Sequence, residues 1–226
     1  MPARTEKAPS QGITIAIDGP ASSGKGTIAR LVAAALGYDH VDTGAMYRAV
    51  ALFTVRAGFA LEAAATVAQQ LSFSFPILDG QRRVVVNGED VSLAIRGEQV
   101  GKGASVVAAI PGVRAALLET QRALGRRGGV VMDGRDIGTV VLPDAELKIF
   151  LDADLKERAR RRARETGANV DTVLAEIHER DLRDSSRAVA PLRAAEDAIH
   201  LDSTCLSIDE VVEQVLALVE AGDGEM

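Results

Sequence analysis

A run of nine residues near the N-terminus combines glycines, a lysine and a hydroxyl side chain. An apolar β-branched segment, residues 13–17, precedes it, and apolar residues at helical spacing follow it from position 28 to Gly37. Converging backbone N–H groups and a helix N-terminus attract phosphate oxygens, while Lys25 would reach the β- and γ-phosphates and Thr27 would ligate Mg²⁺. The order of strand, loop and helix therefore predicts a nucleotide phosphate loop made of Gly19, Pro20, Ala21, Ser22, Ser23, Gly24, Lys25, Gly26 and Thr27.

Arginine dominates the cations of this chain. Of its 26 cationic residues 21 are Arg, and thirteen of these lie between Arg114 and Arg187. A guanidinium grips phosphate or carboxylate with two parallel bonds, which an ammonium does not. Surface ion pairs also use arginine, so composition alone leaves both interpretations open.

Further apolar runs at residues 38–41, 129–132, 147–151 and 198–201 alternate with helical patterns, including 113–124 and 211–219. Alternating strands and helices indicate right-handed crossovers and a mostly parallel sheet. Residues 73–92 break this rhythm with two Asx-Gly pairs between short β-rich runs, which is typical of consecutive hairpins. We expect an α/β fold with a five-stranded sheet flanked by helices and a small three-stranded antiparallel insertion.

Length and composition limit the class of protein. The chain has 226 residues, 47% of them hydrophobic, which suits one domain over residues 13–220 after a flexible tail at 1–12. No apolar run reaches 18 residues and the first twelve have no apolar core of a signal peptide, so a cytoplasmic protein without a membrane partner is expected. A net charge of −6 and seven aromatic residues argue against nucleic-acid binding. Nothing suggests a dimer seam, and we expect a monomer.

Two polar segments follow predicted strands and point towards the phosphate loop. One reads D-T-G-A-M-Y-R from Asp42, and the other reads D-G-R-D-I-G-T from Asp133. Ligands of open α/β sheets bind beyond the carboxyl ends of the strands. Arg180, Asp184 and Arg187 are spaced i, i+4 and i+7 on one helical stripe, which on its own is more typical of a solvated ion-pair face.

Four segments together give a more specific indication. D-T-G-A-M-Y-R, V-M-D-G-R-D-I-G-T-V-V, K-I-F-L-D-A and E-R-D-x-R-D-x-x-R-A-V-A-P, together with the G-K-G-T ending of the phosphate loop, resemble the cytidylate kinase family of bacterial nucleoside monophosphate kinases. The resemblance runs from about residue 13 to 218 and implies a P-loop kinase that makes CDP or dCDP from ATP and CMP or dCMP. The insertion would then belong to the acceptor side.

The resemblance also implies roles for individual residues. It assigns Arg48 and Arg135 to the acceptor phosphate, and Ser105, Arg180 and Asp184 to the ribose. The cytosine would be surrounded by Thr43, Arg114, Asp136 and Arg187, where Thr43 replaces the serine expected from the family. Tyr47 would also bind CMP. A short lid over ATP at about residues 155–168 would supply Arg158, Arg161 or Arg162, although the same helix could form surface ion pairs. The candidate catalytic residues are Lys25, Arg135, Arg180 and Arg187.

The metal-side carboxylate is ambiguous in the sequence. Asp133 and Asp152 both end apolar strands, as a Walker B aspartate does, and we favour Asp133 because Arg135 and Asp136 lie beside it. His40, His178 and His200 have no metal-ligand spacing and are interpreted as structural or surface residues. Cys205, the single cysteine, is interpreted as a small buried hydrophobe.

Two alternative functions remain open at this point. Another small-molecule P-loop kinase, acting for example on shikimate or dephospho-coenzyme A, would share the phosphate loop but not the acceptor. A nucleotide-dependent switch without kinase activity would bind ATP but release no ADP in response to an acceptor.

Overall fold

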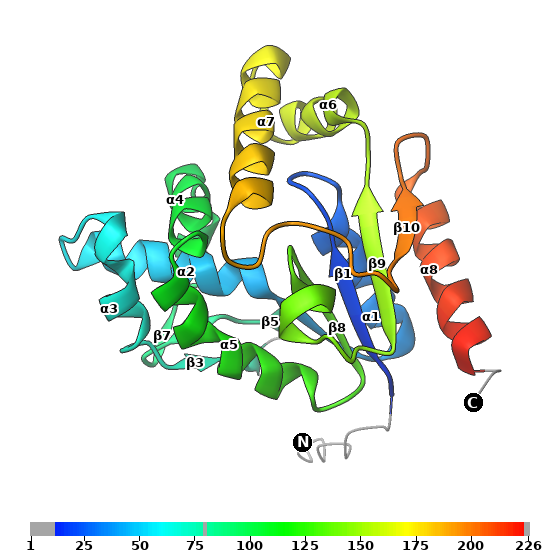
Figure 1. The fold of residues 1–226 in the computed structure, drawn as a ribbon, viewed down its shortest axis with the longest axis horizontal. Coiled ribbons are helices and arrows are strands. Elements are labelled where there is room, and N and C mark those ends of the chain that lie inside the picture. Colours follow the sequence, from blue (N-terminus) through cyan, green and yellow to red (C-terminus); the bar gives the residue numbers. More distant parts are fainter. Residues whose placement is uncertain (1–11, 79–80, 224–226) are drawn as a thin grey trace.

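The core of the molecule is a five-stranded parallel sheet (Figure 1). The computed structural model describes residues 12–78 and 81–223, so the predicted tail at 1–12 lies almost entirely outside the described residues. The strands run in the order β10-β9-β1-β8-β2. Each lies within two residues of its predicted position, which confirms the predicted fold: β1 (Thr14–Asp18), β2 (Asp39–Asp42), β8 (Val130–Gly134), β9 (Leu147–Asp152) and β10 (Ile199–Asp202).

Helices cover both faces of the sheet, because apolar side chains of its central strands alternate between two cores. Ile15 and Ile17 pack against α1 (Lys25–Leu36) and α8 (Ile208–Asp223). Between them, Ala16 faces the opposite core with Met132, where η3 (Ile137–Val141) and α5 (Pro111–Gly125) close the face. Burial on both faces explains why these strands read as continuous apolar runs rather than alternating ones.

A second group of helices lies to one side of the sheet. These are α2 (Thr43–Arg56), α3 (Ala64–Ala68), α4 (Glu98–Ala108) and the start of α5, joined by the short helices η1 (Leu61–Ala63) and η2 (Ala94–Arg96). Met46, Val50, Val107 and Leu117 form their common core. Helix α2 begins directly after β2, with Asp42 as its N-cap, so this core holds the residues that follow the second strand of the sheet.

The antiparallel insertion is more interrupted than predicted. A three-stranded sheet joins β3 (Phe73–Ser74), β6 (Val85–Val86) and β7 (Glu89–Asp90), and a separate ribbon pairs β4 (Ile77–Leu78) with β5 (Gln81–Arg82). Pro76 separates the two pieces, since it has no N–H to donate to a ladder, and its carbonyl accepts a bond from Arg83 instead. The turn at Asn87-Gly88 has positive φ at both residues, as predicted, whereas the Asp79-Gly80 turn lies outside the described residues.

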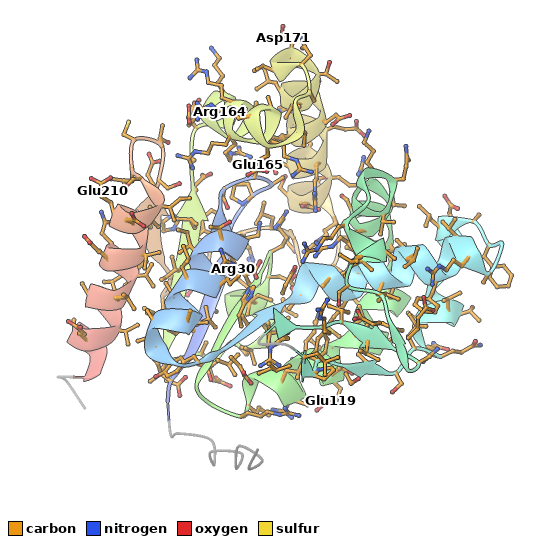
Figure 2. The ribbon with its side chains drawn as sticks, turned by 180° about the vertical axis from the view of Figure 1, so that it is seen from behind. Arg30, Glu119, Arg164, Glu165, Asp171 and Glu210 are labelled. Carbon is orange, nitrogen blue, oxygen red and sulfur yellow. The ribbon has the colours of Figure 1, made fainter. Side chains whose placement is uncertain are left out.

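Helices α6 (Leu155–Thr166) and α7 (Val170–Ser186) form a hairpin beyond the carboxyl end of the sheet (Figure 1). Gly167, with φ of 70°, ends α6, and the side chain of Asn169 caps α7. Exposed charged side chains such as Arg164, Glu165 and Asp171 cover the hairpin (Figure 2). Within the described ranges no single helix is both long and apolar enough to cross a membrane, although two sharply bent helix pairs pass that test together.

Candidate active site

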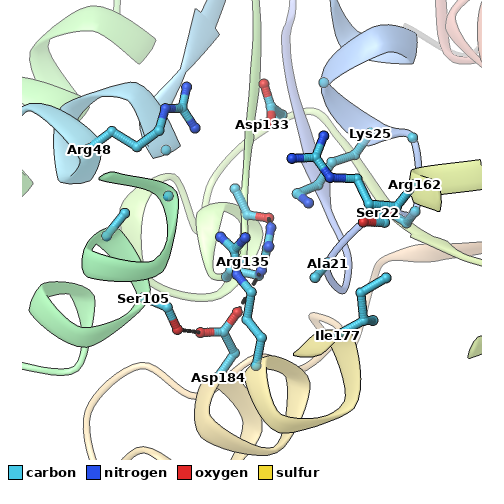
Figure 3. A pocket seen from close by; sticks show the side chains of 18 of the residues that line it. Ala21, Ser22, Lys25, Arg48, Ser105, Asp133, Arg135, Arg162, Ile177 and Asp184 are labelled. Carbon is cyan, nitrogen blue, oxygen red and sulfur yellow. Dashed lines mark hydrogen bonds and ion pairs between the residues drawn. The ribbon is translucent and has the colours of Figure 1, made fainter. Parts of the chain in front are cut away.

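A cleft of about 1690 Å³ lies where the carboxyl ends of the strands meet the α6–α7 hairpin. The phosphate loop, the start of α2, the segment after β8 and one face of α7 line this cleft (Figure 3). This is the location expected for a ligand in an open α/β sheet. All the predicted cytosine-, ribose- and acceptor-phosphate residues lie along it: Thr43, Tyr47, Arg48, Ser105, Arg114, Arg135, Asp136, Arg180, Asp184 and Arg187.

Glycines shape the phosphate loop at two positions. A Cβ on Gly19 would lie 2.1 Å from the carbonyl oxygen of Leu151, so β1 and β9 approach too closely there for any side chain. Gly24 has φ of 91° and serves as the N-cap of α1, a conformation that other residues rarely adopt. Between them Ser22 has φ of 60°, a strained value for a residue with a side chain. The loop is therefore held in one unusual conformation.

Lys25 is the first residue of α1 and is only 8% exposed. Its ammonium donates a hydrogen bond to the carbonyl of Pro20 at 3.1 Å. Burial, together with the nearby charge of Arg135, lowers the pKa of Lys25 to about 7. The site thus carries a cation whose charge the protein itself compensates poorly.

Three arginines face Lys25 across the cleft. Arg135 donates to Asp184 at 2.9 Å, and Arg48 pairs with Asp42 at 2.6 Å. The charges of both Arg135 and Arg48 act on Arg180, whose buried Nε has no hydrogen-bond partner among the described residues. Burial and Arg135 lower the pKa of Arg180 to about 10. A buried donor without a partner is costly, and an anionic ligand would supply the missing acceptor.

Asp136 is the centre of a buried ion-pair cluster at the inner end of the cleft. It pairs with Arg114, and Arg187 approaches its other oxygen at 3.1 Å. Burial raises the pKa of Asp136 against the opposing effect of both guanidinium groups. The Arg114 guanidinium also lies over the ring of Tyr47, 5.6 Å from its centroid. The cluster thus presents fixed donors and acceptors in a confined space.

Two of the predicted ribose residues, Arg180 and Asp184, lie on α7, and the third, Ser105, lies on α4. Asp184 is buried and lies 3.5 Å from the Ser105 hydroxyl, which also accepts a bond from Arg183 at 3.1 Å (Figure 3). Helix α7 ends at Ser186, so Arg187 is its C-cap in an extended conformation rather than part of the predicted helical stripe. The backbone turn after Ser186 directs Arg187 to Asp136 instead.

Asp133 and Thr27 lie at the N-terminus of α1. Asp133 is buried, and its Oδ2 lies 3.7 Å from where a Cβ of Gly26 would stand, while its Oδ1 is 2.8 Å from His40. Thr27 is exposed to the cleft. Asp152, the alternative carboxylate, lines a separate hollow with Phe150 and His200 and accepts a bond from the N–H of Ala153. The geometry favours Asp133 over Asp152 as the carboxylate beside the phosphate loop.

The lid arginines have different surroundings. Arg161 and Arg162 line the cleft, where Arg161 donates to the carbonyl of Ser203 at 2.6 Å and Arg162 pairs with Glu165 at 3.1 Å. Arg158 is buried and donates to the backbone carbonyl of Ala21 in the phosphate loop. Arg158 therefore contacts the phosphate loop from the protein interior and not from the cleft.

One prediction about a side chain is wrong. Cys205 is exposed and lines the cleft, whereas the sequence suggested a buried hydrophobe. It lies in the turn between β10 and α8, where no strand or helix periodicity indicates burial. His178 and His200 are surface residues, as predicted. Among the described residues no cluster of three or more His, Cys, Asp or Glu side chains could hold a metal ion.

Sequence reasoning missed Asp18, the last residue of β1. Its two carboxylate oxygens accept hydrogen bonds from the N–H groups of Ile137 and Gly138, each at 2.8 Å. Burial raises the pKa of Asp18 to about 7. It thereby joins the strand before the phosphate loop to the segment that carries Arg135 and Asp136. The available signal was a carboxylate that ends an otherwise apolar strand.

Known proteins resemble this chain over nearly its whole length. A protein named cytidylate kinase from Stutzerimonas stutzeri (strain A1501) is 52% identical over 219 residues, which cover 92% of this chain and 96% of that protein. Another of that name from Aeromonas salmonicida (strain A449) is 48% identical over 225 residues, 96% and 98% of the two chains. A solved structure of an uncharacterized protein from Eubacterium ventriosum ATCC 27560 shares the fold, with a TM-score of 0.51, 13% identity and coverage of 92% and 98%.

The family assignment follows from these matches. The sequence model described as Cytidylate kinase matches residues 15–221, which include the phosphate loop, both polar segments after β2 and β8, and all of α7. The four sequence segments predicted the same family. This protein belongs to the cytidylate kinase family.

Proposed function

We propose that this protein transfers the γ-phosphoryl group of ATP to CMP or dCMP, which yields ADP and CDP or dCDP. The observation that carries the proposal is the group of cations around one cleft: Lys25, Arg135 and Arg180 lie close enough to repel one another, and burial together with this repulsion lowers the pKa of both Lys25 and Arg180. Two nucleotides that meet end to end would bring the missing negative charge. Membership of the cytidylate kinase family supports the same reaction.

The donor side is the phosphate loop. Its backbone N–H groups and the N-terminus of α1 would hold the β- and γ-phosphates, with the buried ammonium of Lys25 beside them. Phosphoryl transfer needs positioning and charge neutralisation more than covalent chemistry. A lysine already held by Pro20 requires little reorganisation when the phosphates arrive.

The chemistry of the donor set fits Mg²⁺ that enters with ATP. Thr27 offers a hydroxyl and Asp133 a carboxylate whose Oδ2 faces Gly26, and a hydroxyl with one carboxylate is the small protein contribution that Mg²⁺ accepts when phosphates complete its shell. His40 orients Asp133 through its other oxygen. When bound, the ion would neutralise charge on the transferring phosphoryl group.

The acceptor side is formed by α2, α4, α7 and the segment after β8. Arg48 and Arg135 would bind the phosphate of CMP, while Ser105, Arg180 and Asp184 would bind its ribose. Arg135 and Arg180 also lie near enough to Lys25 to affect its pKa, so both would touch the transferring group. The insertion supports this side, because Val86 and Val91 pack against Ala45 and Ala49 of α2.

The inner cluster would read the cytosine ring. Cytosine presents an unprotonated N3 and a 4-amino group, so it needs a donor next to an acceptor. Arg114 only donates and Asp136, when ionised, only accepts. Thr43, Tyr47 and Arg187 would enclose the same ring, with the Thr43 hydroxyl held by its bond to the carbonyl of Asp133 at 2.8 Å.

Helix α6 would serve as the lid, over about residues 155–168. Arg161 and Arg162 already line the cleft there, and closure would exclude water as a competing acceptor. We further propose a monomeric cytoplasmic enzyme that binds no nucleic acid. The net charge of −6 supports the last point.

A coupled ADP-release assay tests the proposal. The protein with Mg²⁺ and ATP is given CMP, dCMP, UMP, AMP, GMP, shikimate or dephospho-coenzyme A in separate reactions, with a reaction lacking acceptor as control. We expect CMP and dCMP to give the highest kcat/KM. Release of ADP that no acceptor stimulates would indicate a nucleotide-dependent switch, and a preference for shikimate or dephospho-coenzyme A would indicate another small-molecule kinase.

A further inference from the structure

The tip of the phosphate loop is bonded to the α6–α7 hairpin through one residue, Ala21. The N–H of Ala21 donates to Asp181 of α7 at 2.9 Å, and its carbonyl accepts from Arg158 of α6, also at 2.9 Å. Both partners lie more than 130 positions away in the sequence. The backbone conformation at the loop tip thus depends on two side chains of the hairpin.

Arg158 and Asp181 also hold one another. An Nη1 atom of Arg158 donates to the second oxygen of Asp181, and its Nε donates to the carbonyl of Ala153 at 2.8 Å. The two side chains are 8% and 18% exposed. A buried ion pair with further hydrogen bonds adds little net stability but strongly restricts orientation. The pair therefore acts as a rigid bracket for the Ala21 peptide groups.

The Ala21 side chain completes the attachment. Ala21 is 3% exposed and packs with Ala159 and Ala163 of α6 and Val173 and Ile177 of α7. Figure 3 shows Ala21 next to Ile177 at the edge of the cleft. The next residue, Ser22, has φ of 60°, and such strained values persist only where the surroundings impose them. The hairpin contacts at Ala21 provide that constraint.

We propose that Arg158 and Asp181 are positioning residues for the ATP phosphates, acting through Ala21 and without touching the nucleotide. The inference rests on the proposed function and replaces the direct ATP contact that the sequence suggested for Arg158. Because Asp181 adjoins Arg180 on α7, the same helix that holds the donor loop also carries an acceptor residue. The bracket sets the distance between the two phosphate sites.

The test measures binding of MgATP by calorimetry together with separate KM values for ATP and CMP. Arg158→Ala and Asp181→Ala should each weaken ATP binding roughly tenfold, since each removes a charge-assisted bond to the loop. The double variant should be no weaker than the worse single variant, because both side chains form one bracket. Binding of CMP alone should change less than about twofold, and amides of residues 19–27 should exchange hydrogen faster.

The controls use the same two helices. Arg160→Ala on α6 and Asp171→Ala at the far end of α7 (Figure 2) remove exposed charges that do not contact the loop, and both should bind MgATP like the unaltered protein. Should an alanine variant fail to fold, Arg158→Lys and Asp181→Asn each keep one bond to Ala21 and should give smaller losses of ATP affinity.

Three results would overturn the inference. ATP binding unchanged in Asp181→Ala would show that the loop needs no bracket. Additive losses in the double variant, with Arg158→Ala the more severe, would indicate direct contact between Arg158 and ATP. Equal losses for ATP and CMP would indicate general destabilisation. The binding arm needs no turnover, so an enzyme inactive towards CMP that still showed the expected ATP losses would refute only the proposed function.

Discussion

The donor and acceptor sides of the cleft differ in the partners of their cationic side chains. On the acceptor side, Arg48 pairs with Asp42, Arg135 with Asp184, and both Arg114 and Arg187 with Asp136. On the donor side, the Lys25 ammonium has a neutral carbonyl as its hydrogen-bond partner, with two arginines and two aspartates as charged neighbours. Four acceptor-side arginines thus bond to a carboxylate, whereas Lys25 bonds to a carbonyl and Arg180 keeps a buried Nε without a partner among the described residues.

This difference separates affinity for charge from selectivity. An uncompensated buried cation gains most from any polyphosphate that reaches it, whatever base that nucleotide carries. A guanidinium already held by a carboxylate gains less from charge but is held in a fixed direction, so a ligand must match its hydrogen-bonding pattern. We therefore expect the donor side to contribute most of the rate, and the acceptor side most of the choice of substrate.

The largest effect should come from removing the uncompensated cation. Lys25→Met should lower kcat/KM for CMP by about 10²–10³, the usual loss when one preorganised electrostatic contact to a transition state disappears. Arg30→Met, an exposed position on the same helix (Figure 2), is the matched control and should retain full activity. More than about a tenth of the original kcat/KM in the Lys25 variant would contradict the role.

The same variant should also affect the stability of the free protein. Burial of the Lys25 ammonium disfavours its charged form, so the free protein with methionine there should melt no lower than the unaltered protein at pH 6. The melting temperature in the absence of nucleotide measures this. A clear fall in melting temperature would show that Lys25 stabilises the fold, which would contradict an unfavourable buried charge at this position.

The next largest effect is expected from a change in the Asp136 ion-pair cluster on the acceptor side. Arg114→Met removes the donor beside the cytosine N3, and the preference for CMP over UMP should narrow by roughly a hundredfold, as expected for a lost hydrogen bond to a charged group. Arg187 remains 3.1 Å from Asp136, so the carboxylate keeps one cationic partner. Kinetics with both acceptors on this one variant provide the measurement.

ATP binding and the melting temperature are the controls for Arg114→Met. ATP binding should stay close to that of the unaltered protein, whereas the melting temperature should fall, because Arg114 is one partner of a buried ion pair. A variant that keeps its full preference for CMP over UMP would exclude Arg114 from reading the base.

A similar or smaller effect is expected at the ribose. Asp184→Ala should weaken CMP by roughly tenfold to a hundredfold and dCMP less, if the carboxylate accepts a bond from the 2′-hydroxyl. Asp184 also holds Arg135 at 2.9 Å, so some loss on both substrates is expected. Values of kcat/KM for the two substrates separate these effects. Equal losses of kcat/KM for CMP and dCMP would show that Asp184 acts only by positioning Arg135.

The sheet was predictable from the sequence because its signal is local. Strands buried on both faces appear as short apolar runs, and the run at 13–17 differs from β1 by one residue. The insertion was less predictable, since Pro76 interrupts the ladder and β3 pairs with β6, through Phe73 with Val86 and Ser74 with Val85, across the β4–β5 ribbon that separates them in the sequence. Pairings between distant short strands leave little trace in a local pattern.

The residue types of the site were predictable, but their burial and partners were not. Spacing placed Lys25 in a loop, and only the three-dimensional neighbours show that Arg135 and Arg180 oppose its charge. The links of Asp18 to Ile137 and of Asp181 to Ala21 join segments more than 100 residues apart. No periodicity within one segment indicates such contacts.

Lys25 should take up a proton when ATP binds. With its pKa near 7, Lys25 is mostly neutral at pH 8.5 in the free protein, whereas bound phosphates favour the charged form. ATP is fully ionised there, because the second ionisation of a phosphate ester has a pKa near 6. Binding should therefore take up as much as one proton, and ATP affinity should fall as pH rises above 7. Calorimetry in buffers of different ionisation enthalpy counts that proton.

Lys25→Met and Asp18→Asn test which group takes up the proton. The Lys25 variant should bind ATP without proton uptake. The Asp18 variant should keep the uptake, because both carboxylate oxygens of Asp18 already accept bonds from backbone N–H groups. The pH dependence of the free energy of unfolding of the nucleotide-free protein provides a second, independent test. A lysine whose pKa is depressed from 10.5 to about 7 binds fewer protons folded than unfolded, so its contribution to the free energy of unfolding rises across that interval. Lys25→Met should flatten this rise, and a rise that persists would assign the proton to another group.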